Sequence, residues 1–160
     1  MKRNPTPQNN RTKLPHEVFA LCDEAKTVAE RVEILRVEAT FGIKTLLQAN
    51  YHKDVIFDLP AGAPPYRENE AVAGNQRRHF EKMVKDLKHL IVQSPLTKFQ
   101  KESKYIRLLE CLAAEDAKIL VAVKEKKLKS LYKSLTESTV RKAFPKLLPA
   151  PEPKEPKKEG

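Results

Sequence analysis

Hydrophobic side chains recur at intervals of three and four residues along most of the chain, the spacing that places them on one side of an α-helix. In the first third of the chain, this spacing predicts three short helices. Pro15 suits the first position of the first helix, where a missing N–H costs nothing. Thr27 and Glu30 have the spacing of a capping box that starts the second helix. We expect Thr40 and Gly42 to break this helix before the third one begins.

A proline-rich connector, residues 53–70, follows these helices. The β-branched and aromatic run at 55–57 is too short for a strand and has no second strand to pair with, so we expect an extended segment. A phosphate-binding loop needs several glycines and free backbone N–H groups, whereas Gly62 stands alone here and the prolines remove donors. Asp58 and Glu68 flank nothing that would raise their pKa, so an enzyme that uses them ranks below the two binding hypotheses given at the end of this subsection. The connector is predicted to be a rigid strut.

The clearest predicted element is a long helix from about Ala71 to Val92. Its apolar side carries Phe80, Met83, Val84, Leu87, Leu90 and Ile91. Ser94 and Pro95 then have the residue types of a helix cap and a first helical position. The helix that they would start has a wide apolar arc, which includes Phe99, and is therefore predicted to be the central and most buried one.

Two further helices complete the pattern. Glu115 and Asp116 suit the positive N-terminal end of one of them. Thr136 is the predicted cap of the last helix, with Leu135 and Val140 spaced as a hydrophobic staple. The sequence as a whole predicts an all-α protein, a compact bundle of about six or seven helices.

The two ends of the chain differ from this helical part in composition. Residues 1–13 form a basic arm and residues 149–160 a tail of proline, lysine and glutamate, and both are expected to be disordered. A single helical domain, residues 14–148, lies between them and is long enough to bury a hydrophobic core. It divides into N-terminal helices, the connector and C-terminal helices, at residues 14–52, 53–70 and 71–148.

The charge of the chain favours anionic partners. The 31 lysines and arginines exceed the 21 acids, which gives a formal net charge of +10. Lysine is much more frequent than arginine, so point-charge attraction is expected more than base readout. Cys22 and Cys111 are too few for a disulfide framework and are predicted to stay reduced in the cytoplasm. The chain has no apolar run long enough for a membrane span and no apolar leader segment at its start.

Two groups of basic residues are the candidate binding site. The first group lies opposite the apolar side of the long helix: Arg78, Lys82, Lys85 and His89. The second group crowds the C-terminal end of the helix that starts near Glu115: Lys124, Lys126, Lys127 and Lys129. The two groups could meet as one phosphate-binding face. The alternative is an ordinary solvated surface, and few aromatic residues are left over from the core for stacking on bases.

No pattern in the chain predicts catalysis. The four histidines do not recur at metal-ligand spacing with an acid, and neither cysteine has a partner at such a spacing. The serines are accounted for as caps or surface positions, and a convergent triad has nothing to favour it. We therefore expect no enzyme, no metal site, no cofactor and no small-molecule substrate.

Several segments resemble a known family. They are EVFALCDEAKTVAERVEILR at 17–36, FDLPAGAPPY at 57–66, EDAKILVAVKEKKL at 115–128 and LTESTVRKAFPKLLP at 135–149. They are similar to small proteins of unknown function encoded by large contractile-tailed bacteriophages. The resemblance covers most of the chain apart from its two ends. It implies a phage origin, a place in the host cytoplasm or the virion, and a non-enzymatic role, and it provides no catalytic residues to carry over.

Two functional hypotheses follow from the charge and the resemblance. The first is a helical binding protein that docks on nucleic acid or a nucleoprotein complex through the basic face. The second is a structural or adaptor component of the phage particle or its assembly, whose ends lie along acidic protein surfaces. In both, the partner is nucleic acid or an acidic protein surface, and no membrane is involved.

Overall fold

The computed structural model describes residues 13–69 and 76–149 of the chain. Within these ranges it contains eight α-helices and one 3₁₀ helix, η3, and it confirms the predicted all-α class. The elements are α1 (Pro15–Glu24), α2 (Val28–Glu38), α3 (Phe41–Tyr51), α4 (Gln76–Met83), η3 (Val84–His89), α5 (Lys98–Cys111), α6 (Ala114–Lys124), α7 (Leu128–Leu131) and α8 (Glu137–Ala143). The basic arm apart from Lys13, and the tail apart from Pro149, lie outside the described residues.

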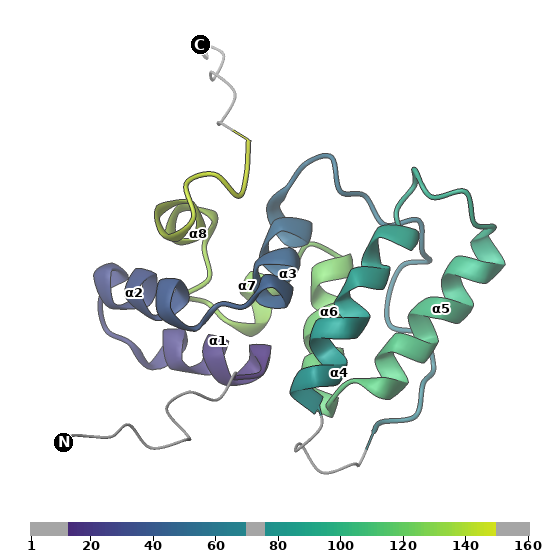
Figure 1. The fold of residues 1–160 in the computed structure, drawn as a ribbon, viewed down its shortest axis with the longest axis horizontal. Helices are drawn as coiled ribbons and strands as arrows, with labels where there is room; N and C mark the ends of the chain where they lie inside the picture. The colour runs from purple at the N-terminus through teal and green to yellow at the C-terminus, as the bar shows by residue number, and fades with distance from the viewer. Residues whose placement is uncertain (1–12, 70–75, 150–160) are drawn as a thin grey trace.

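Helix α6 is at the centre of the bundle. It contacts α1, α3, α5 and α7, while α1, α2 and α8 lie on one side of Figure 1 and α4 and α5 on the other. The prediction that the helix containing Phe99 is central is therefore wrong, since α5 lies at the edge and Phe99 is 77% exposed. The reason is the width of the buried face. Helix α6 buries residues around most of its circumference, whereas α5 buries only one side.

The predicted starts of several helices are confirmed. Pro15 occupies the first turn of α1, and Thr27 and Glu30 form the capping box of α2. Thr136 caps α8 through its hydroxyl. The break predicted at Thr40 is confirmed, since α2 ends at Glu38, and Thr40 has a second role in the structure. Its hydroxyl accepts a hydrogen bond from the third residue of α3, at 3.2 Å, and so begins that helix.

The predicted long helix is two helices of different type. Helix α4 ends at Met83, and the chain continues as η3, while residues 71–75 of the prediction lie outside the described part. Side chains three apart are aligned in a 3₁₀ helix. Val84, Leu87 and Leu90 have this spacing, and they are 4%, 5% and 0% exposed. The tighter turn therefore keeps all three in the core.

Helix α5 starts later than predicted. Thr97, and not Ser94, is its cap, and Gln100 completes a capping box with backbone bonds of 3.0 and 3.1 Å. This box satisfies two backbone N–H groups at once, which a single serine cap does not. Ser94 and Pro95 instead belong to the turn before the helix.

The first half of the connector pairs with a distant segment, which the sequence pattern did not predict. Phe57 forms an isolated antiparallel bridge with Ile91. The backbone bonds beside it run from Asp58 to Leu90, at 2.8 Å, and from Val92 to Ile56, at 2.9 Å. The extended conformation is confirmed, but the segment does have a partner, since the chain returns to it after η3.

Helices α3 and α4 meet at a close contact around Gly42. The carboxylate of Glu81 accepts a hydrogen bond from the backbone N–H of Gly42, at 3.0 Å, and another from the hydroxyl of Thr40. A Cβ atom on Gly42 would lie 2.5 Å from the ring of Phe80 and 2.8 Å from the Glu81 carboxylate. Gly42 thus lies inside α3, where the sequence predicted a break, and its missing side chain lets α4 approach.

We expect Gly42→Ala to lower the stability of the protein. The added methyl group would push against Phe80, which is 3% exposed and has little room to move. Overpacking of this kind typically costs about 1–3 kcal/mol, which outweighs the advantage of up to about 1 kcal/mol that alanine has over glycine in a helix. Urea unfolding should show a lower midpoint for Gly42→Ala than for the wild type. In a Phe80→Leu background, which leaves space for the methyl group, the same change should cost less. An equal loss in both backgrounds would contradict the packing argument.

Candidate nucleic-acid interface

The first half of the connector is fastened to α5 by a buried lysine. Asp58 accepts a bond from Lys98 on one carboxylate oxygen and from Lys101 on the other, both at 2.8 Å. The Lys101 side chain is only 2% exposed. The hydrogen bonds from Lys101 and Lys98 lower the pKa of Asp58, the opposite of what a general base needs at neutral pH. Asp58 is therefore placed as a structural acceptor.

A second buried lysine holds the tip of the connector to α6. Lys124 donates to the backbone carbonyls of Pro60 and Gly62, the latter at 2.9 Å, and to the neighbouring Glu125. Glu125 in turn accepts the Gly62 N–H at 2.7 Å. The Lys124 side chain is 3% exposed. The sequence prediction for Lys124 is therefore wrong, because its ammonium group bonds inside the protein and does not face a partner.

The sequence contains the signal that would have placed Lys124 correctly. It lies four residues after Leu120 and seven after Ala117, both buried, so it falls on the core stripe of α6. Lysine is tolerated there because the connector supplies carbonyl oxygens for the ammonium group.

Lys126 is also bound within the protein. Its ammonium group donates to the carbonyls of Ala49 and His52, at 2.9 and 2.8 Å, at the C-terminal end of α3. Those carbonyls lack partners inside the helix, and the negative end of the helix dipole favours a cation. Burial lowers the pKa of Lys126. Lys126, Lys127 and Lys129 are all exposed, but of these three described lysines only Lys126 donates its ammonium group to backbone carbonyls.

The first predicted group lies in a different place. Lys82 and Lys85 are exposed on α4 and η3, and His89 is half-buried at the end of η3. Arg78 belongs to α4, but its side chain lies outside the described residues. An open hollow at the junction of α3 and α4, named here the junction hollow, is lined by Phe41, Glu81, Lys82 and Lys85.

The two predicted groups do not meet as one local face. Lys126 lies at the C-terminal end of α3, whereas Lys82 and Lys85 share a hollow with Phe41, its first residue. Eleven residues at 1.5 Å each separate the two ends by about 16 Å. Of the predicted site residues, Lys82 and Lys85 therefore lie together as exposed cations, in the junction hollow.

The acid in the junction hollow is already engaged. Glu81 bonds to the N-terminal turn of α3, where the positive end of the helix dipole stabilises its charge. Within the described residues, no carboxylate forms an ion pair with Lys82 or Lys85. The charge that the junction hollow presents is therefore positive.

The sequence analysis missed Phe41. This side chain is 62% exposed although it is large and apolar. The buried stripe of α3 consists of Ile43, Leu46 and Leu47, and Phe41 lies off it. Lys44, one turn further on, is exposed, and its ammonium group lies 5.3 Å from the centre of the Phe144 ring. Recognising Thr40 as the cap of α3 would have put Phe41 on a helix and revealed its outward position.

A further polar pair, His16 and Asp116, joins two helices. His16 donates its backbone N–H to one oxygen of Asp116, at 3.0 Å, and its ring Nδ1 lies 2.9 Å from the same oxygen. The hydrogen bond to Asp116 raises the pKa of His16 against the opposing effect of burial. Asp116 is 1% exposed and lies in the first turn of α6, so the pair fastens α1 to α6. Among the described residues, no group of three or more potential ligands is placed to hold a metal ion.

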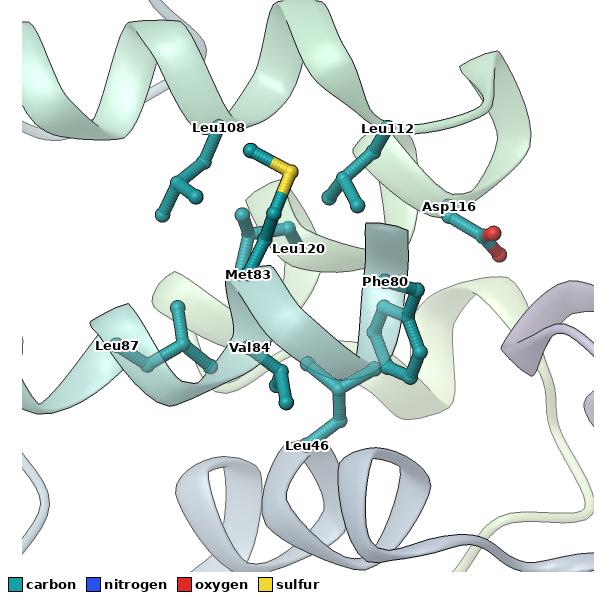
Figure 2. Close-up of a pocket in the computed structure, with 9 residues that line it drawn as sticks. All are labelled: Leu46, Phe80, Met83, Val84, Leu87, Leu108, Leu112, Asp116 and Leu120. Carbon is teal, nitrogen blue, oxygen red and sulfur yellow. The ribbon is translucent and has the colours of Figure 1, made fainter. Parts of the chain in front are cut away.

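The core contains a small cavity between α3, α4, α5 and α6. Figure 2 shows Met83 pointing between Leu108 and Leu112, with the Asp116 carboxylate to one side and directed away from them. The cavity volume is about 10 Å³, the space of a single water molecule. It is a packing gap and not a pocket for a small-molecule ligand.

Comparison with known proteins identifies a family of unknown function. The model of a family of unknown function (DUF6433) matches residues 18–130, which is most of the chain. Neither the search of curated proteins nor the search of solved structures finds a match. None of the helices in the described part is long and apolar enough to cross a membrane.

Asp58→Asn should destabilise the protein at neutral pH, because it leaves the Lys101 ammonium group buried without its carboxylate. The double variant Asp58→Asn, Lys101→Met should recover part of the loss, since it removes both charges. The urea midpoint measures both effects.

The deficit of Asp58→Asn should also depend on pH. The pKa of Asp58 is lowered in the folded state, so its contribution is present above the ordinary pKa of about 4 and is lost as the pH falls through the folded value. The midpoints of wild type and variant should therefore converge in acid. A deficit that persists at low pH would show that the asparagine disturbs packing and not the ion pair.

Proposed function

We propose that this chain, which belongs to the family of unknown function, is a non-enzymatic helical protein that docks on nucleic acid or a nucleoprotein complex. The observation that carries the proposal is the junction hollow, where Lys82 and Lys85 lie beside an exposed aromatic ring. Lysines attract phosphate groups without reading sequence. The net charge of +10 would assist the approach of a polyanion over longer distances.

The biological setting is part of the same proposal. The resemblance of segments 17–36, 57–66, 115–128 and 135–149 to proteins of large contractile-tailed phages supports an origin in such a phage. The protein would then act in the host cytoplasm or in the virion.

A structural or adaptor role in the phage particle is the second candidate. It is favoured by large apolar side chains that are exposed and do not line the junction hollow, above all Val37, 65% exposed, and Phe99, 77% exposed. Exposed apolar groups of this size suit contact with another protein. Mass spectrometry of purified particles separates the candidates, since stoichiometric copies in the particle favour the structural role.

The charge-reversal variant Lys82→Glu, Lys85→Glu tests the docking proposal. We expect it to weaken binding to a fluorescent DNA oligonucleotide by at least tenfold in an anisotropy titration. The slope of log affinity against log salt should also fall by about one for each lost phosphate contact. Both side chains are exposed, so the fold should not change.

The matched control is Lys127→Glu, Lys129→Glu. It makes the same change in net charge at exposed lysines that are far from the junction hollow along α3. Binding should fall much less in the control than in the test variant. Equal losses in the two variants would mean that only the overall charge matters. No binding by the wild type, even at low salt, would end the docking proposal and leave the structural role.

A further inference from the structure

We infer that the junction hollow takes single-stranded nucleic acid, with a base stacked on the ring of Phe41 and the phosphates held by the lysines around it. This inference rests on the proposed function and narrows its ligand. The residues that carry it are named here the Phe41 track: Lys82, Lys85, Phe41, Lys44 and Phe144.

The backbone of Phe41 is held in place, and its ring is left uncovered. It follows the cap residue Thr40, so its backbone belongs to the rigid first turn of α3, and the Phe41 carbonyl accepts the hydroxyl of Thr45 at 2.9 Å. At the same time its side chain is 62% exposed. An exposed aromatic ring on an anchored backbone suits stacking on an unpaired base, because every base offers a flat face whatever its sequence.

Cations and rings alternate along the track. Lys82 and Lys85 share the junction hollow with Phe41. Phe41 and Lys44 are three residues apart on α3, so they are neighbours on one face of the helix. Lys44 then lies 5.3 Å from the ring of Phe144 after α8. The track therefore runs from α4 across α3, which contact each other, to Phe144 after α8.

The same arrangement argues against duplex DNA as the preferred ligand. In a duplex, the faces of the bases are stacked on each other and only their edges are open in the grooves. The lysines of the track would still attract the backbone of a duplex, but Phe41 would find no base face.

The test compares single-stranded DNA of about 15 nucleotides with the duplex of the same sequence. This length is near the upper site size of a single OB fold. The full chain is titrated as wild type, Phe41→Ala, Phe41→Tyr and Phe99→Ala. Phe99 is the matched control, because it is a still more exposed phenylalanine on a different helix.

We expect Phe41→Ala to weaken single-strand binding about tenfold and to change duplex binding much less. Phe41→Tyr keeps a ring and should bind like the wild type. Phe99→Ala should bind like the wild type as well. Excess poly-glutamate, which offers charge without bases, should compete poorly with the single strand.

Three results would overturn the inference. The first is unchanged single-strand binding by Phe41→Ala while Lys82→Glu, Lys85→Glu loses it, in which case the proposed docking stands without stacking. The second is equal affinity of the wild type for the single strand and the duplex. The third is displacement of the single strand by poly-glutamate as readily as by unlabelled DNA, which would indicate an acidic protein partner. No binding to either form of DNA would remove the proposed function together with the inference.

Discussion

Helix α3 is bound at both ends by side chains of opposite charge, and the position of the candidate site depends on this arrangement. Glu81 bonds to its N-terminal turn and Lys126 to its C-terminal carbonyls. Each charge matches the helix dipole at its end and satisfies backbone groups that have no partner within the helix. The contact of Glu81 brings α4 against α3, and Gly42 permits the approach. Lys82 and Lys85 consequently stand beside Phe41.

Charged side chains that satisfy distant polar groups also determine the position of the connector. Lys101 and Lys124 are almost completely buried, and a buried ammonium group is tolerated only where oxygen atoms surround it. Asp58 and the carbonyls of the connector provide those oxygens. The proline-rich segment is therefore held against α5 and α6 by ion pairs and hydrogen bonds at Asp58, Pro60 and Gly62. The hydrogen bonds from Lys101 and Lys98 also lower the pKa of Asp58.

Local signals were sufficient for much of the helical architecture. The capping box at Thr27 and Glu30 was readable because its two residues are close in sequence. The contacts that decide the site are not local. Glu81 is 39 residues from Gly42, and Lys101 is 43 residues from Asp58. A periodic pattern shows which side of a helix is apolar, but it does not say which distant carboxylate or carbonyl will meet a lysine. The split of the long helix into α4 and η3 is of the same kind, since spacing by three fits both helix types until the core selects one.

The functional meaning of a basic sequence therefore depends on which of its cations remain after the fold has used the others. The sequence analysis grouped Lys124 and Lys126 with Lys127 and Lys129, yet the first two donate to backbone carbonyls of the protein. Lys82 and Lys85 differ because the acid beside them is engaged by a helix end. Net charge determines how strongly a polyanion is attracted from a distance. Under the proposed docking, the place where it binds would be set by Lys82, Lys85 and the Phe41 ring beside them.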